Sequence, residues 1–135
     1  MASIHHEITL ATPPEQVWDA VRDIGALHTR LVPGFVVDTV LEEGARVVTF
    51  ANGMVARELI LSCDDTRPRL AWTIVGGRMT HHNGVLQLYP APGGGTRACW
   101  TADLLPHDLA EPIGALMADG LAAMQRHFAA TAGAA

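Results

Sequence analysis

Residues 35–63 are FVVDTVLEEGARVVTFANGMVARELILSC, and this stretch decides the fold class of the chain. Two turn signals, Glu43-Gly44 and Asn52-Gly53, divide it into three runs of strand length that are rich in valine, leucine and other β-forming residues. Asn-Gly is a strong hairpin signal because both residues tolerate positive φ. Successive hairpins predict an antiparallel meander and argue against alternating βαβ units.

The same pattern of strands and turns extends to both sides of this stretch. Further turn signals lie at residues 64–68, 76–77 and 91–95, and an alternating apolar segment stands near the start of the chain. The sequence therefore predicts seven strands, at residues 4–10, 35–41, 46–51, 54–63, 69–75, 81–89 and 96–105.

Helices are predicted before and after the meander. Thr12-Pro13-Pro14-Glu15 has the form of a capping box with an early proline, and it opens a helix that stops at Gly25. A second short helix is expected within residues 26–33. A long helix with one apolar stripe is expected from residues 108–111 to Phe128, followed by a frayed tail at residues 129–135.

Length and composition limit the classes of function. The chain has 135 residues, 49% of them hydrophobic, which predicts a single domain over residues 1–135 with a real core. It has nine arginines, no lysine and a net charge of −5, so no basic surface for nucleic acid is expected. The start resembles no signal peptide, no apolar run is long enough for membrane insertion, and the two cysteines fit a reduced compartment. We therefore expect a cytoplasmic protein.

Seven strands and one long helix predict an α+β fold with a particular geometry. A curved sheet must cover its apolar face, and only one long helix is available to cover it. A strongly bent sheet around a single helix leaves a gap between the two. That gap is either filled by large side chains or is a ligand cavity, and the function depends on which of the two holds.

This order of elements resembles the helix-grip fold of the SRPBCC superfamily, which includes START-like domains, polyketide cyclase and dehydrase-like proteins, and birch-pollen-allergen-like proteins. The resemblance covers residues 4–128. It implies a curved seven-stranded antiparallel sheet wrapped around the C-terminal helix, with two short helices after the first strand. It is carried by Pro14-Glu15-Gln16-Val17-Trp18, Asp23-Ile24-Gly25, Pro33-Gly34-Phe35, Arg57-Glu58, Asp64-Asp65, Arg69-Leu70-Ala71-Trp72, Gly76-Gly77, Thr96-Arg97, Trp100 and Pro106.

The superfamily does not by itself fix a function, because it holds lipid carriers, hormone receptors, hydrophobic-ligand binders and a few cyclases. Its plant hormone-receptor branch anchors an acidic ligand with a pocket lysine, which this chain lacks.

Strand parity selects the residues that face the long helix. Alternation places Trp72, His82 and Trp100 on the concave side of the sheet, where the tryptophans serve either as ligand-stacking walls or as core. A glycine inside a helix costs about 1 kcal/mol against alanine, so Gly120 suggests a close approach by another group. The expected ligand-binding set is Glu58, Trp72, His82, Trp100, Met117, Gly120 and Met124.

The strand at residues 54–63 is ambiguous. Its apolar content favours the face that carries Arg57 as the inner one, whereas the resemblance favours Glu58, and we choose Glu58. A buried Glu58 near His82 would be a candidate catalytic acid–base pair. The alternative is a surface ion pair between Glu58 and a neighbouring arginine, since charged residues are mostly exposed.

Metal and cofactor sites are not predicted. Adjacent strand residues point to opposite faces, so His81 and His82 cannot ligate one ion, and the same holds for His5-His6. Neither a metal motif nor a phosphate-binding loop is present. Cys63 and Cys99 have no basic neighbour in sequence that would lower their pKa values, so we expect structural thiols.

Three functional hypotheses follow. The first is a protein that binds a small, mostly hydrophobic, lipid- or polyketide-like ligand between sheet and helix, with Asn52, Gly53 and residues 26–33 as a gate at the mouth. The second is a polyketide cyclase or dehydratase that uses His82 and Glu58 for proton transfer. The third is an interaction protein with a closed cavity that acts through a partner or as a homodimer.

Overall fold

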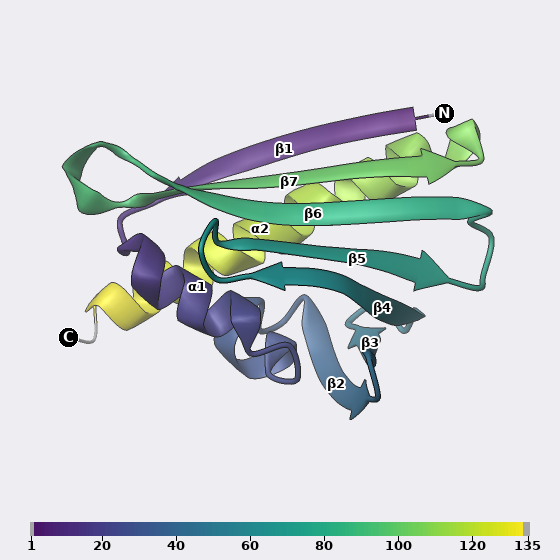
Figure 1. Cartoon of the computed structure of the whole chain (residues 1–135), viewed down its shortest axis with the longest axis horizontal. Helices are drawn as coiled ribbons and strands as arrows, with labels where there is room; N and C mark the ends of the chain where they lie inside the picture. Colours follow the sequence, from purple (N-terminus) through teal and green to yellow (C-terminus); the bar gives the residue numbers. More distant parts are fainter. Residues whose placement is uncertain (1, 134–135) are drawn as a thin grey trace.

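Seven strands form one antiparallel sheet in the computed structural model, which describes residues 2–133 (Figure 1). The strand order is β1-β7-β6-β5-β4-β3-β2, so every pair except β1–β7 joins neighbours in sequence, as a meander requires. The elements are β1 (Ala2–Leu10), α1 (Pro14–Arg22), η1 (Leu27–Leu31), β2 (Val36–Glu42), β3 (Ala45–Phe50), β4 (Val55–Asp64), β5 (Arg69–Val75), β6 (His81–Pro90), η2 (Pro92–Gly94), β7 (Thr96–Leu105), η3 (His107–Leu109) and α2 (Ala110–Gly133).

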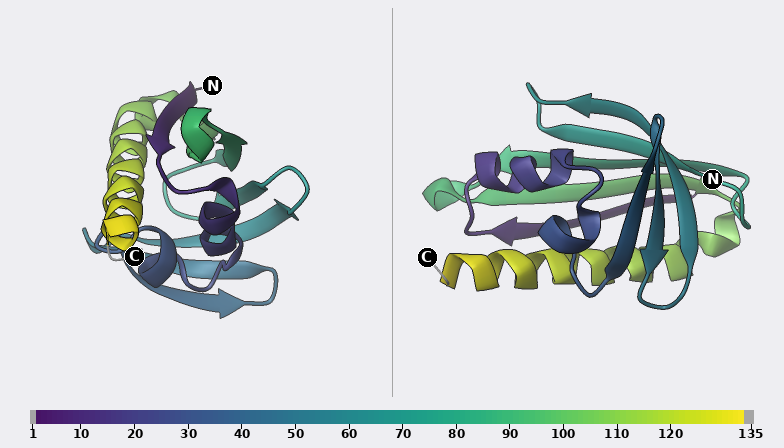
Figure 2. Two further views of the ribbon diagram at one scale, coloured as in Figure 1. Left: turned by 90° about the vertical axis from the view of Figure 1, so that its left-hand side faces the viewer. Right: turned by 90° about the horizontal axis from the view of Figure 1, so that it is seen from below.

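The predicted α+β helix-grip architecture is confirmed. The sheet curves around α2, and α1 and η1 are the two short helices that follow β1 (Figure 2). The alternation predicted for β6 holds, because His82, Gly84, Leu86 and Leu88 are buried while the residues between them are not. The alternation has the period of two residues that is expected of a strand with one face toward the core.

The long helix covers only part of the sheet. Helix α2 packs mainly against β1 and buries Met117, Leu121, Met124 and Phe128. The segment from α1 to β2 packs beside it, with Leu27 and the residues around it in the same core cluster. Within residues 2–133 neither α2 nor any shorter helix combines the length and hydropathy needed to cross a bilayer.

Two helix boundaries differ from the prediction. The capping box at Thr12 is wrong, because Pro13 occupies the N-cap position without a side-chain hydrogen bond. The backbone carbonyl of buried Thr12 instead accepts a hydrogen bond of 2.7 Å from the Thr96 hydroxyl. Helix α2 also continues past Phe128 to Gly133, where a frayed tail was expected, and residues 134–135 lie outside the described part of the chain.

The turn between β3 and β4 sets the register that matters most for the site. The Phe50 amide donates to the Met54 carbonyl at 2.8 Å, which closes a loop of residues 51–53. Only Gly53 takes a positive φ, of 89°, and Asn52 does not need one. This register places Arg46 opposite Glu58.

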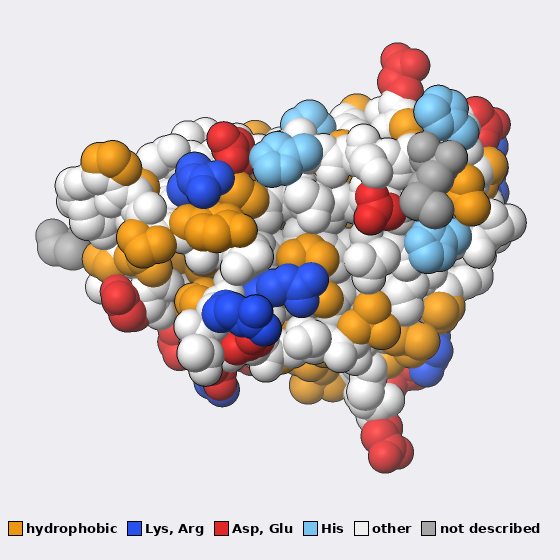
Figure 3. All heavy atoms as spheres, turned by 45° about the horizontal axis from the view of Figure 1, so that its top comes forward, with side chains coloured by type: hydrophobic (Ala, Val, Ile, Leu, Met, Phe, Trp, Pro, Cys, Tyr) orange, Lys and Arg blue, Asp and Glu red, His pale blue; other side chains and the backbone are white. Residues whose placement is uncertain are grey.

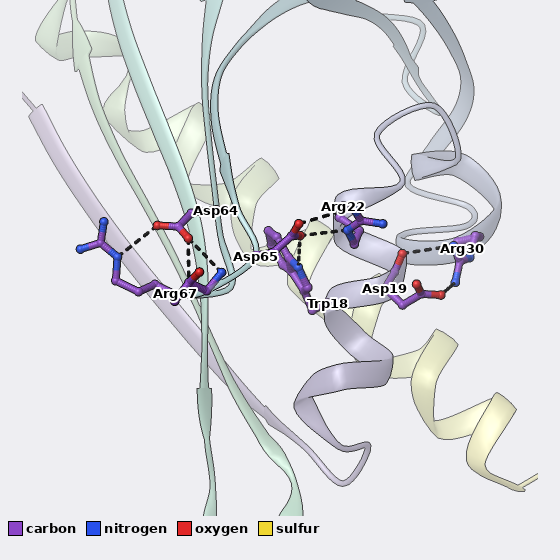
Figure 4. A network of polar contacts seen from close by, with 8 residues as sticks. Trp18, Asp19, Arg22, Arg30, Asp64, Asp65 and Arg67 are labelled. Atoms are coloured by element: carbon purple, nitrogen blue, oxygen red, sulfur yellow. Dashed lines mark hydrogen bonds and ion pairs between the residues drawn. The ribbon is translucent and has the colours of Figure 1, made fainter.

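Helix α1 is tied to the sheet by a polar contact at the β4–β5 turn (Figure 4). The indole nitrogen of Trp18 donates to Asp65 at 2.8 Å, and Arg22 donates to the same carboxylate oxygen at 2.9 Å. Asp64 accepts hydrogen bonds from the backbone amides of Thr66 and Arg67, which holds the turn itself. The turn therefore presents Asp65 to α1 in a fixed position.

We expect Trp18→Phe to lower the free energy of unfolding by about 2 kcal/mol, because the part-buried hydrogen bond to Asp65 is lost and the smaller phenyl ring leaves part of the buried indole's space empty. Urea unfolding of the two proteins measures the difference. The control is Arg22→Gln, which breaks an exposed ion pair and should cost less than about 0.5 kcal/mol. An equal cost for both variants would contradict the assignment of the link to the indole.

Candidate functional site

A cavity of about 520 Å³ lies between the concave face of the sheet and α2. Its wall is mostly apolar and draws on every strand from β2 to β7, on η1 and on α2. Six of the seven residues expected from the sequence line it, namely Glu58, Trp72, His82, Trp100, Met117 and Met124. The seventh, Gly120, does not line the cavity but borders two of the aromatic rings that do.

Two parts of the cavity lining differ in exposure. The side chains of Leu27, Leu31 and Val32 line one part of the cavity and are buried, so the segment expected to be part of the mouth contributes inner surface. In the other part the lining includes the β5–β6 loop and the exposed side chains of Met54 and Val55. Asn52 and Gly53 stand next to this rim in the β3–β4 turn without lining the cavity.

Two glycines allow aromatic rings of the cavity wall to pack directly against the backbone. A Cβ atom at Gly84 would lie 2.9 Å from the Trp72 ring and 3.0 Å from the His82 ring. A Cβ atom at Gly120 would lie 2.9 Å from the Trp100 ring and 3.0 Å from the Phe35 ring. The close approach predicted at Gly120 is therefore made by aromatic side chains of the protein itself.

Glu58 faces inward, and its partner is a residue that the sequence analysis did not single out. Glu58 and Arg46 are 5% and 4% exposed, and the Arg46 guanidinium donates to the Glu58 carboxylate at 2.8 Å. Arg57 points the other way and makes an exposed ion pair with Glu42. The choice of Glu58 over Arg57 agrees with this geometry. The alternative, a surface ion pair between Glu58 and an arginine, gave the right kind of partner but the wrong place, because the pair is buried.

Arg46 escaped the sequence analysis because its role depends on the loop that precedes Glu58. Closing the hairpin on Asn52-Gly53 alone would shift the pairing by one residue and set Arg46 opposite Leu59. The one available signal is the charge of Arg46 itself, which stands directly before the apolar pair Val47-Val48.

His82 is a buried and neutral side chain. Its Nδ1 accepts a hydrogen bond of 3.1 Å from the Ile74 backbone amide. Burial, with a smaller contribution from the neighbouring His81, lowers the pKa of His82 to about 4. Because a backbone amide only donates, Nδ1 must be unprotonated, and the proton of the neutral ring stands on Nε2.

The proposed acid–base pair is not formed as a hydrogen bond. Glu58 bonds to Arg46, while His82 bonds to the backbone of Ile74, and the two side chains do not hydrogen-bond to each other. The Nδ1 lone pair of His82 is occupied and its Nε2 is protonated, so this ring donates hydrogen bonds at neutral pH rather than accepting protons.

Trp100 lies beside Trp72 in the cavity wall. Its ring lies 6.0 Å from that of Trp72, centroid to centroid, at an angle of 52°. The indole Nε1 of Trp100 is buried and has no hydrogen-bond partner among residues 2–133. Because this atom has almost no accessible surface, it is closed to a ligand in the cavity.

On the outer face of β1 and β7, three side chains of the kinds that bind metal ions lie close together, and an arginine already contacts two of them. His5, Glu7 and Cys99 place their ligand atoms within 4.8 Å of one another. Arg97 donates to Glu7 at 2.9 Å and to the Cys99 sulfur at 3.0 Å, so a cation stands where a metal ion would have to bind. Burial, together with a hydrogen bond to Glu7, raises the pKa of the Cys99 thiol to about 11.

The side of the molecule that carries β1 shows no gathering of one charge. Basic, acidic and histidine side chains are scattered over it among apolar ones (Figure 3). On this side the surface therefore offers no extended patch of one sign.

Comparisons with known proteins agree with this architecture. The model of the family described as polyketide cyclase/dehydrase and lipid transport matches residues 1–133. The comparison with curated proteins finds no match.

Solved structures show the same fold at low sequence identity. An uncharacterized protein from Bacillus thuringiensis is 18% identical with a TM-score of 0.85, over 94% of this chain and 98% of that one. The protein XoxI from Bacillus cereus is 19% identical with a TM-score of 0.84, over 95% and 96%. A norcoclaurine synthase point mutant from Thalictrum flavum, in complex with a transition-state analogue, is 16% identical with a TM-score of 0.69, over 96% and 95%.

We expect Gly120→Ala to lower the free energy of unfolding by about 1–2 kcal/mol, although alanine favours a helix, because the new methyl group meets two packed rings. The matched control is Gly114→Ala in the same helix, where the nearest atom is 3.7 Å away and about 0.5–1 kcal/mol should be gained. Thermal and urea unfolding measure both changes. Shifts in the same direction would count against close packing at Gly120.

Burial of His82 predicts a loss of stability in mild acid. Above pH 6.5 the ring is neutral in both states, whereas between pH 6.5 and about 4 only the unfolded chain takes up the proton. Stability should therefore fall as the pH falls through this window, by at most about 3 kcal/mol in total. The charged and titratable groups on neighbouring elements are His81, Glu58 and Arg46.

Urea unfolding at pH 7 and pH 5 tests this expectation. His82→Gln should flatten the pH dependence while keeping an acceptor for the Ile74 amide. His81→Gln, on the exposed side of the same strand, removes only the smaller cause of the lowered pKa of His82 and should change the dependence much less than His82→Gln does. Parallel profiles for the original protein and His82→Gln would contradict the buried neutral ring.

Proposed function

Because the chain belongs to the polyketide cyclase/dehydrase and lipid-transport family, we propose that it binds a small, mostly hydrophobic, lipid- or polyketide-like molecule between the sheet and α2. The observation that carries the proposal is the cavity of about 520 Å³, which has mostly apolar walls and a rim of exposed side chains. A volume in this range suits a small-molecule ligand.

Burial of apolar ligand surface supplies the driving force. Each 100 Å² of apolar surface removed from water contributes about 2.5 kcal/mol before the cost of association. Trp72 and Trp100 act as flat walls, and the unbranched side chains of Met117 and Met124 adapt to the ligand's shape. A few polar groups, Glu58 and His82 among them, fix its orientation.

The rim suggests how a ligand passes in and out. The lining there includes Val55, which is 63% exposed, and the adjacent pair Gly76-Gly77 of the β5–β6 loop. We propose that the β3–β4 turn at Asn52 and Gly53 and this loop form the gate. Both glycine-containing turns take positive φ values, a conformation that few other residues share at low cost.

The enzymatic alternative is a cyclase or dehydratase, and it is favoured by the presence of Glu58 and His82 on the same cavity wall. The hydrogen bonds of both groups argue against it as an acid–base pair, because Glu58 is held by Arg46 and His82 lacks a free lone pair. The interaction-protein alternative needs a filled interior, which a cavity of this size does not support. The homodimer and the cytoplasmic location stay predictions.

We expect two uncharged apolar probes, fluorene and 1-dodecanol, to raise the thermal unfolding midpoint of the protein by several degrees at saturation. Ala56→Phe should weaken binding at least tenfold, because residue 56 is buried and its side chain lines the cavity. Differential scanning fluorimetry and displacement of a fluorescent naphthalene dye measure the two effects.

Arg57→Phe provides the matched control, since it adds the same ring to the exposed face one residue further along β4. It should leave probe affinity unchanged. Failure of both probes to bind, or equal weakening by the two variants, would sink the proposal.

A further inference from the structure

We propose that the ligand carries a neutral carbonyl oxygen and that His82 anchors this oxygen by donating a hydrogen bond from Nε2. The inference rests on the proposed function and names the chemical class of the ligand. Its evidence is the hydrogen bonding of the cavity wall, which leaves this Nε2 donor without a partner in the described part of the chain.

The protonation state of His82 follows from its backbone contact. Ile74 donates its amide hydrogen to Nδ1 at 3.1 Å, so Nδ1 carries no proton. The neutral ring then has its hydrogen on Nε2. This ring edge lines the cavity, and in the described part of the chain no side chain or backbone group bonds to it.

His82 is deeply buried, so its N–H has little choice of partner. The residue is 6% exposed, and the ring packs beside Trp72 over the space that Gly84 leaves open. Buried donors are normally paired, and within this cavity a partner must come from a ligand or from cavity water. An acceptor oxygen on an otherwise apolar ligand meets this requirement.

Trp100 does not supply a second anchor. Its indole Nε1 has no hydrogen-bond partner among residues 2–133, but it has almost no accessible surface, so a ligand in the cavity cannot reach it. The donor that needs an acceptor is therefore Nε2 of His82, and neither a hydrocarbon nor a ligand with only donor groups satisfies it.

The charge balance of the cavity selects a neutral oxygen over a carboxylate. Arg46 is neutralised by Glu58 at 2.8 Å, so the buried part of the lining has no unpaired positive charge among the described residues. Arg78 also lines the cavity, but it is exposed at the rim. A buried carboxylate would lack a cationic partner, whereas a ketone or ester carbonyl needs only a donor.

A matched pair of aromatic probes tests the anchor. Fluorene and 9-fluorenone share one tricyclic frame and differ by a carbonyl oxygen. We expect the original protein to bind 9-fluorenone about tenfold more tightly than fluorene, which corresponds to about 1.4 kcal/mol. Infrared spectroscopy should show the carbonyl stretch of the bound ketone at lower frequency than in an apolar solvent.

Variants assign the hydrogen bond to its donor. His82→Phe should abolish both the tenfold preference and the infrared shift, and His82→Gln should retain them, because its amide can accept from Ile74 and donate to the ketone. His81→Phe adds the same ring on the exposed face of β6 and should change neither.

Each other outcome overturns the inference in a distinguishable way. Equal binding of the two probes to the original protein removes the carbonyl anchor but leaves an apolar binding protein. Binding of neither probe removes the proposed function as well. A preference that survives His82→Phe and disappears in Trp100→Phe moves the anchor to the indole and overturns its assignment to His82.

Discussion

A single helix cannot cover the concave face of a seven-stranded curved sheet, and the candidate site lies in the part of that face that the helix leaves uncovered. Helix α2 packs mainly against β1, so the concave side of β3, β4 and β5 is left to η1, to the residues before β2 and to the sheet's own side chains. Aromatic rings reduce the remaining space without filling it. They stand close to the backbone because Gly84 and Gly120 carry no side chain, and bulkier residues there would push the rings toward the cavity.

The buried Arg46–Glu58 pair gives this space its electrostatic character. Removing two charges from water is costly, and their mutual attraction repays that cost only with good geometry. The 2.8 Å contact, together with the Arg46 guanidinium 5.8 Å from the centre of the Trp72 ring, provides such geometry. The pair leaves the interior polar at one wall but without net charge, and the donor of His82 then selects among the ligands that fit.

Much of the fold could be predicted because its signals are local. Turn residues such as Gly44 and Gly53 mark where strands end, and the alternation in β6 identifies its buried side from His82 onward. Two predictions from local patterns were wrong. The predicted cap at Thr12 is not formed, and Thr12 instead makes a long-range hydrogen bond with Thr96. Helix α2 runs five residues beyond Phe128, the last residue of its predicted apolar stripe. At Thr12 a distant part of the chain sets the outcome, whereas at the C-terminus the exposed Ala129 and Ala130 continue the helix because alanine is the strongest helix former.

The sequence by itself determined the order of the elements, their antiparallel connection and the faces on which Trp72, His82 and Trp100 lie. These properties follow from turn chemistry and from periods of two and 3.6 residues, which need no knowledge of distant parts of the chain. Only the tertiary structure decided that Arg46 stands opposite Glu58, that the cavity stays open and that Nε2 of His82 is left without a partner among the described residues. These depend on the length of one loop and on distances between elements far apart in sequence, and a change of a single residue in strand register would alter the pairing.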